Sequence, residues 1–207
     1  MFRLYQRPGW GSAIIEAQLA FYGLAHELEE VGDVFEDAAA RAALARLNPV
    51  AQIPALVLPS GEVMSESAAI TLYLADVAGT DALVPGPGAE ARAAFLRWLV
   101  FLVANIYPCF TFADVPTRFV ADAEAAKAFR AAVDEHAKGL WRAVEVAAGA
   151  PWFLRERFSA LDIYIGVMCH WRPRPAWFAA ETPKIAAIAK AAQARPDMVA
   201  VFARNFG

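Results

Sequence analysis

Three polar residues, Ser65, Glu66 and Ser67, stand directly before a segment with helical apolar spacing at residues 69, 72 and 73. All three are candidates to cap the start of a helix. A helix start that offers a hydroxyl and free N–H groups binds a carboxylate well, because the helix dipole favours negative charge there. The Glu66 carboxylate beside it can hold an ammonium group. The stretch could therefore bind the free end of an amino acid, which carries both charges, or it could simply cap the helix.

The preceding residues predict a β-hairpin that would position this stretch. An Ile53-Pro54 step opens the apolar run 55–58, and proline suits the start of a strand because it has no backbone N–H. Residues 59–61, Pro-Ser-Gly, are typical of a tight turn, and residues 62–64 can return as a second strand.

Two ordered motifs carry a family resemblance. Residues 48–56, Asn-Pro-x-x-Gln-Ile-Pro-Ala-Leu, are followed by the hairpin and then by Glu-Ser-x-Ala-Ile-x-x-Tyr-Leu at 66–74. This set resembles the glutathione-binding half of soluble glutathione S-transferases, most closely bacterial members. Phe-Ser-x-x-Asp-Ile-Tyr at 158–164 resembles the core helix of the family's second domain, where members often have Gly at the position of Arg155. The resemblance spans nearly the whole chain.

The first eighty residues predict an α/β domain. Strands and helices are expected to alternate at 2–5, 13–22, 25–31 and 38–47, before the hairpin and a helix at 66–77. The order βαβα then ββα implies a right-handed crossover and a mixed sheet. The resemblance implies a thioredoxin-like fold with a cis Ile53-Pro54 peptide bond.

A change in composition near residue 80 predicts a domain boundary. We expect a thioredoxin-like domain at 1–80, a Gly/Pro-rich linker at 81–88 and an all-helical domain at 89–207. In that domain one helix is expected to end at Pro108 and another to run over 121–148. A Ser159-x-x-Asp162 capping box should start a central apolar helix.

Composition favours a soluble cytoplasmic protein. The two cysteines, Cys109 and Cys169, form no metal-spaced cluster, so neither a metal site nor a disulfide framework is expected. Residues 1–82 carry four basic and eleven acidic side chains, which argues against nucleic-acid binding there. The most apolar stretch, 98–106, is about half the roughly 20 residues that a membrane span needs.

The resemblance assigns roles at the first loop and the hairpin. The family stabilises the glutathione thiolate with a donor in the loop after the first strand, which here reads Pro-Gly-Trp-Gly-Ser at 8–12. Gly11 stands where the nearest bacterial pattern has cysteine, so we expect Ser12 to be the donor, with the backbone of Gly11 as the alternative. The Ile53 backbone, before Pro54, would pair with the cysteinyl part of glutathione. The remaining contacts are expected from Gln52, Glu66 and Ser67.

A hydrophobic second substrate would meet an aromatic wall on the first long helix of the helical half. The candidates are Trp10 in the first loop and, in the helical half, Trp98, Asn105, Tyr107, Phe110 and Phe112. Aromatic residues at helical spacing are also typical of a core, and for Trp98 that interpretation is favoured.

The resemblance therefore implies a homodimeric enzyme that joins glutathione to a small hydrophobic electrophile. Two alternatives stay open. One is a glutathione-dependent disulfide or peroxide reductase, because such chemistry needs less thiolate activation. The other is a non-catalytic protein-binding module, since the Gly-Trp-Gly loop at 9–11 departs from the family pattern.

Overall fold

The strands form one mixed sheet in the order β2-β1-β3-β4. In the computed structural model, which describes all residues 1–207, β1 (Phe2–Gln6) pairs in parallel with β2 (His26–Glu30). On its other side β1 is antiparallel to β3 (Ala55–Val57), which in turn pairs with β4 (Val63–Met64). The predicted thioredoxin-like order and the hairpin are confirmed.

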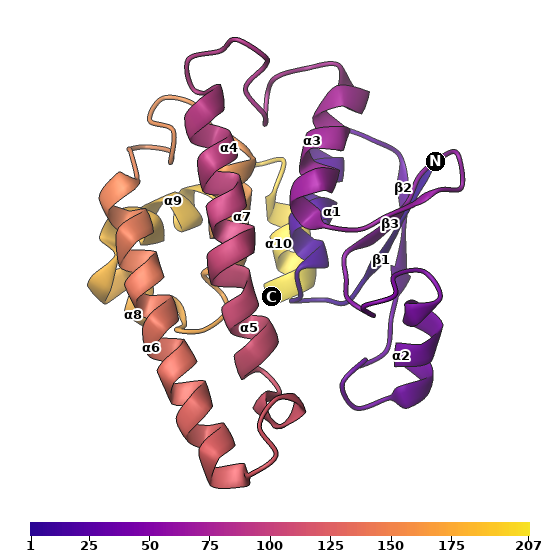
Figure 1. Cartoon of the computed structure of the whole chain (residues 1–207). Helices are drawn as coiled ribbons and strands as arrows, with labels where there is room; N and C mark the ends of the chain where they lie inside the picture. Colours follow the sequence, from indigo (N-terminus) through magenta and orange to yellow (C-terminus); the bar gives the residue numbers. More distant parts are fainter. The chain divides into compact units, whose positions relative to one another are not determined.

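Helices complete this first unit, which comprises Met1–Gly86 and Ala191–Gly207. Helices α1 (Ser12–Phe21) and α3 (Ser67–Ala78) pack together, and α10 (Val199–Phe206) lies beside α1 (Figure 1). Helix α2 (Ala38–Ala45) lies apart from them, and its N-cap residue is Asp37, whose carboxylate accepts from two backbone N–H groups. The end of the chain thus packs with the first unit in space, whereas the sequence suggested one helical domain over 89–207.

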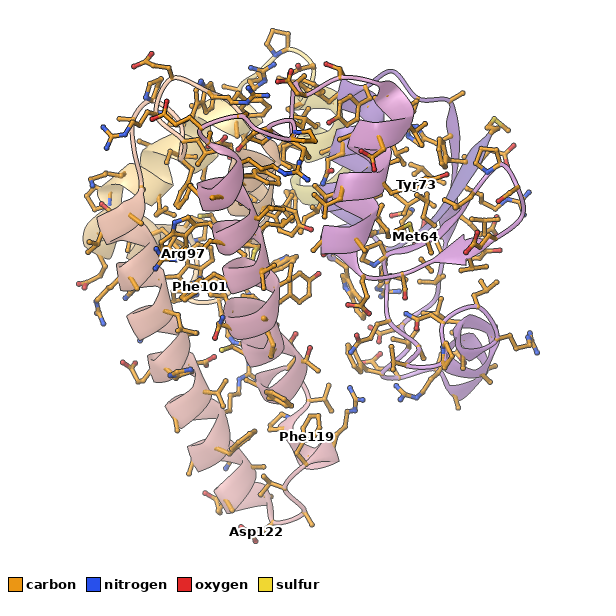
Figure 2. All side chains as sticks on the ribbon, turned by 45° about the horizontal axis from the view of Figure 1, so that its top comes forward. Met64, Tyr73, Arg97, Phe101, Phe119 and Asp122 are labelled. Atoms are coloured by element: carbon orange, nitrogen blue, oxygen red, sulfur yellow. The ribbon has the colours of Figure 1, made fainter.

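The second unit, Pro87–Lys190, is built from helices. Asp122 is the N-cap residue of the long helix α6 (Ala123–Ala147), and Phe119 lies in the connection that precedes it (Figure 2). The fully buried α7 (Ala160–Met168) is the predicted central helix. The remaining elements are α4 (Arg92–Phe101), α5 (Tyr107–Ala113), a 3₁₀ turn (Pro116–Arg118), α8 (Pro175–Glu181) and α9 (Pro183–Gln193), which runs into the first unit.

The predicted helix end at Pro108 is wrong. A π-helical turn (Leu102–Ile106) joins α4 to α5, so Pro108 and the aromatic residues around it are helical. A proline inside a helix removes one hydrogen bond and crowds the preceding turn, and a π-turn widens the helix there. The resulting stretch, Arg92–Ala113, is long and apolar enough to cross a membrane by length and composition alone. A core helix of a soluble protein passes the same test.

The start of α7 is the capping box that the sequence predicts. The Asp162 carboxylate accepts from the backbone N–H groups of Phe153 and Ser159, each at 2.7 Å, and from the Ser159 hydroxyl at 3.1 Å. Both capping residues are fully buried. The motif therefore has a structural role, since it joins the 151–158 loop to the central helix.

Candidate active site

Strand register brings the predicted binding residues to one end of the sheet. The antiparallel pairs Tyr5↔Ala55 and Leu56↔Met64 place the end of β1, the start of β3 and the end of β4 at the same end of the sheet. The loop 7–11 follows the first of these ends, Ile53-Pro54 precedes the second, and the start of α3 follows the third. Three short segments from distant parts of the unit can therefore contact one extended ligand.

The start of α3 keeps its donors free, and the predicted capping by Ser65, Glu66 or Ser67 is wrong. Glu66 is the N-cap residue, yet no side chain accepts from the first N–H groups of the helix. The Ser67 hydroxyl likewise has no protein partner. Glu66 is exposed and has a φ of +66°, a conformation that L-residues other than Asn and Asp rarely adopt. This end of the helix therefore offers free N–H groups, a hydroxyl and a carboxylate.

The Ile53-Pro54 peptide bond is cis, as the resemblance implied. The backbone N–H and C=O of Ile53 take no hydrogen bond within the protein, so they can pair with an added extended segment. Buried Asn48 shapes the approach to this step: its Nδ2 donates to the Gln52 carbonyl at 2.8 Å, and its Oδ1 accepts from the Val50 N–H at 3.3 Å. The Gln52 side chain is exposed.

The Ser12 hydroxyl does not face open solvent. Ser12 is fully buried, and its hydroxyl donates to the Arg7 carbonyl at 3.3 Å and accepts from the Arg7 N–H at 3.2 Å. It closes the loop 7–11 rather than presenting a free donor. The N–H groups of Gly11 and Ser12, at the start of α1, have no acceptor in the protein, so the backbone alternative fits this geometry better.

Trp10 links the first loop to the cis-proline segment. Its ring packs against a buried cluster that includes Ile53, and its centroid lies 5.3 Å from that of Phe35. The Arg7 guanidinium lies over the Trp10 ring at 5.4 Å and pairs with Asp33 at 3.4 Å. The loop therefore has a cation and an aromatic face beside the thiol-binding position expected from the resemblance.

A buried polar bridge holds the start of α3 against α1. Gln18 Nε2 donates to Thr71 Oγ1 at 2.9 Å, and the Thr71 hydroxyl donates to the Ser67 carbonyl at 2.8 Å. Gln18 and Thr71 are both fully buried. The bridge stabilises the orientation of the helix start that carries the free donors.

A second bridge ties the C-terminal helix to the first loop. Asn205 Oδ1 accepts from the Gly9 N–H at 3.2 Å, and its Nδ2 donates to Glu16 at 3.0 Å. The buried Glu16 carboxylate also pairs with Arg204 at 2.8 Å. Gly9 has a φ of +78°, and a side chain there would come within 3.4 Å of the Asn205 carbonyl. That distance is an ordinary contact, so it is the left-handed backbone of the turn that favours glycine here.

The predicted hydrophobic-site residues of the second unit fall into separate groups. Trp98 packs edge-on against Phe101 and Phe153, with centroids at 5.0 and 5.5 Å, and Figure 2 marks Phe101 on α4. Tyr107 and Phe110 both pack against Trp171, at 5.5 and 5.0 Å. The last two members lie elsewhere: Phe112 packs on Phe119, and Asn105 is exposed with its Nδ2 donating to the Phe101 carbonyl.

Comparison with known proteins decides the family. The chain is 37% identical over 207 residues to an uncharacterised GST-like protein, YncG, of Escherichia coli K12, covering 99% of this chain and 98% of that one. Residues 15–77 match the model of the glutathione S-transferase N-terminal domain. The chain belongs to the glutathione S-transferase family.

Solved structures of bacterial members of the glutathione S-transferase family share this fold. A sphingomonad glutathione S-transferase complexed with glutathione is 31% identical, with a TM-score of 0.77 over 99% of this chain and 100% of that one. A glutathione transferase from Methylococcus capsulatus is 28% identical, with a TM-score of 0.75 over 98% of both chains.

The sequence did not predict several residues that support the candidate active site. Asn205 is a polar residue on the buried side of α10, next to buried Val201 and Phe202, and that pattern could have flagged it. Nothing in the local sequence indicates that Asn205 meets Gly9, or that Thr71 meets Gln18, because each pair is joined only by the tertiary fold.

Proposed function

We propose that the chain is a cytoplasmic, homodimeric glutathione S-transferase that joins the glutathione thiolate to a small hydrophobic electrophile. The observation that carries the proposal is the set of free polar groups at one end of the sheet. These are the start of α3 with Glu66 and Ser67, the Ile53 backbone, and the N–H groups at the start of α1.

The free groups match glutathione in order. Glu66 would hold the γ-glutamyl ammonium group, while Ser67 and the first N–H groups of α3 would hold its carboxylate. The Ile53 backbone would pair with the cysteinyl unit, as in the addition of a strand to a sheet edge, and Gln52 would contact the glycine end. The complex of the sphingomonad relative with glutathione supports a ligand of this class.

The thiol would then lie near the first loop. There we propose that the N–H groups of Gly11 and Ser12 stabilise the thiolate, because the helix start favours an anion and the Ser12 hydroxyl is engaged with Arg7. In the reaction the thiolate sulfur attacks an electrophilic carbon, the C–S bond forms, and the leaving group departs with its electron pair. Trp10 offers an apolar surface beside this position for the electrophile.

Calorimetric titration with reduced glutathione tests the binding half of the proposal. We expect saturable binding by the wild type and at least about tenfold weaker binding by Glu66→Ala, because a charge-assisted hydrogen bond is lost. Glu62→Ala is the matched control, since Glu62 is an exposed carboxylate in the hairpin turn. Equal weakening by both variants would overturn the assignment of Glu66.

An activity assay separates the enzymatic alternatives. Conjugation of a halogenated nitroarene, followed by absorbance, is expected from a transferase. Turnover of a hydroperoxide or a mixed disulfide without conjugation would favour the reductase. Absence of glutathione binding by a folded protein would favour a non-catalytic binding module. Sedimentation at twice the 22.4 kDa chain mass is expected for the homodimer.

A further inference from the structure

The helical unit contains a cavity that the glutathione site does not use. It has a volume of about 400 Å³, within the range of roughly 300–1,000 Å³ typical of small-molecule sites. All its lining residues fall between 109 and 174, inside the unit Pro87–Lys190. None of the residues proposed to hold glutathione belongs to it.

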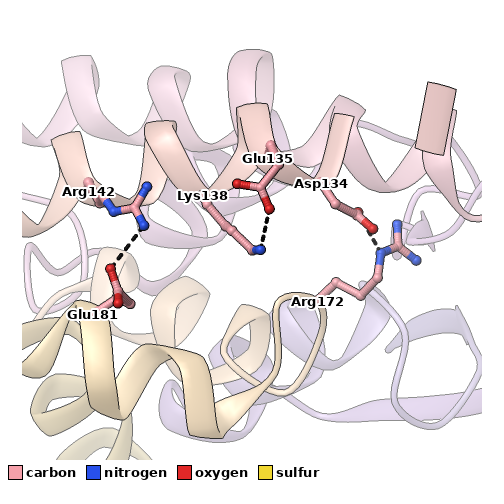
Figure 3. A network of polar contacts seen from close by, with 6 residues as sticks. All are labelled: Asp134, Glu135, Lys138, Arg142, Arg172 and Glu181. Atoms are coloured by element: carbon pink, nitrogen blue, oxygen red, sulfur yellow. Dashed lines mark hydrogen bonds and ion pairs between the residues drawn. The ribbon is translucent and has the colours of Figure 1, made fainter. Parts of the chain in front are cut away.

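Four cationic side chains line this cavity: Arg130, Lys138, Arg172 and Arg174. Asp134 is the single acidic residue in the lining. Figure 3 shows α6 supplying Asp134 and Lys138, while Arg172 comes from the loop after α7. So many like charges around one cavity repel each other unless an anion lies among them.

Salt bridges inside the protein leave part of this charge unused. Arg172 pairs with Asp134 at 2.9 Å, and Lys138 pairs with Glu135 (Figure 3). Arg172 also pairs with Asp114.

Three donor groups remain. Arg172 Nη2 is buried and has no hydrogen-bond partner. Arg130 has no acidic partner, and Arg174 donates only to the His170 carbonyl, at 3.2 Å. A buried donor without an acceptor costs free energy, so an anion at this position would stabilise the arrangement.

The other lining residues are weakly polar or apolar. Phe110, Ala137 and Pro173 form an apolar part of the wall. Cys109 is buried, and burial raises the pKa of its thiol, so it adds no negative charge near neutral pH. The wall therefore combines guanidinium groups with an apolar surface.

We propose that this cavity is a second ligand site, which binds a small organic anion carrying a phosphate or carboxylate group. Arg130, Arg172 and Arg174 hold the oxyanion, because a planar guanidinium group donates two parallel hydrogen bonds to such a group. The apolar body of the ligand lies against Phe110 and Pro173. The cavity is several times larger than an inorganic phosphate ion, so a bare ion would leave most of it to water.

The test is a calorimetric titration of the full chain with three probes. Phenyl phosphate carries both ligand features, inorganic phosphate only the oxyanion, and benzyl alcohol only the apolar body. We expect phenyl phosphate to bind most tightly and less well at high salt. Arg130→Gln and Arg174→Gln should each weaken it by about tenfold or more, the effect of one charge-assisted hydrogen bond.

Arg142→Gln is the matched control, because Arg142 also lies on α6 but pairs with Glu181 outside the cavity (Figure 3). Circular dichroism and thermal unfolding confirm that each variant is folded. Failure of phenyl phosphate to bind at millimolar concentration would overturn the proposal. So would equal affinity in all three arginine variants, or a loss of affinity in Ser67→Ala alone, which would place the probe in the proposed glutathione site.

Discussion

Replacing Asn205 with alanine tests whether the C-terminal helix supports the first loop. The substitution removes the acceptor for the Gly9 N–H and a donor to the buried Glu16 carboxylate. Asn205 itself is 8% exposed, so water does not readily replace the lost partners. Both ends of the bridge lie in the unit that holds the proposed glutathione site.

The two hydrogen bonds differ in strength. A neutral bond such as that from Gly9 contributes about 0.5–1.5 kcal/mol, and one to a charged group about 1.5–3 kcal/mol. Because Glu16 keeps its ion pair with Arg204, we expect Asn205→Ala to lower the free energy of unfolding by about 2–3 kcal/mol. That is a large part of a typical total of about 5–15 kcal/mol.

The effect on binding follows from the loop. Ordering a loosened loop on binding should cost about 1 kcal/mol, which weakens glutathione affinity by about fivefold. Urea unfolding and calorimetric titration well below the melting temperature measure the two effects separately. Val199→Ala, an exposed position on the same helix, is the control and should change either quantity little.

Two outcomes would refute the reasoning. An unfolding free energy within about 0.5 kcal/mol of the wild type would mean that the bridge is not stabilising. A clear loss of stability with unchanged glutathione affinity would mean that the bridge does not support the loop.

Four further predictions follow. Ser67→Ala should weaken glutathione binding by about 1–3 kcal/mol through loss of a charge-assisted hydrogen bond; unchanged affinity would remove the assigned carboxylate contact. Ser12→Ala should lower stability by about 1–3 kcal/mol because its hydroxyl joins the loop backbone twice, yet leave the pKa of bound glutathione unshifted in a thiolate titration; a raised thiol pKa would restore Ser12 as the donor. Burial raises the pKa of Asp162 from its ordinary value of 3.8 to about 6. Between these pH values the folded state keeps a proton that the unfolded chain has lost. The contribution of Asp162 to stability therefore falls as pH rises. The difference in the free energy of unfolding between wild type and Asp162→Asn should change by up to about 1.4 kcal/mol per pH unit between pH 4 and 6. A difference that does not change with pH would contradict this prediction. Arg155→Gly should be neutral or stabilise the protein by up to about 1 kcal/mol, because Arg155 has a φ of +66°, whereas Glu156→Gly next to it should destabilise; chemical unfolding distinguishes the two.

Local patterns predicted much of the fold. The turn at 59–61, the apolar run at 55–58 and the capping box at Ser159 are encoded by neighbouring residues, and the structure contains all three. Family members often have Gly at the position of Arg155, and the backbone there is left-handed, a conformation that favours glycine. These signals depend on few contacts, so a single sequence reveals them.

Other predictions were wrong because residue propensity alone does not determine the local hydrogen bonding. Pro108 is a helix breaker by propensity, but a π-turn lets α4 and α5 continue through it. Ser12 precedes a helical run and has the side chain of a cap, yet its hydroxyl bonds back to Arg7. In both cases the deciding interaction involves neighbouring residues, but in a geometry that residue propensity does not indicate.

Backbone conformation gives an argument about the two proposed sites that is independent of their side chains. Four residues other than glycine have positive φ: Ala51, Glu66, Arg155 and Arg174. Such conformations cost about 1–3 kcal/mol and cluster at functional sites. Glu66 begins the proposed glutathione site, Ala51 lies in the loop before Ile53, and Arg174 lines the cationic cavity. Arg155 lies in neither site, so Arg155→Gly should leave the affinities for glutathione and phenyl phosphate unchanged. Titration of this variant with each ligand tests that expectation.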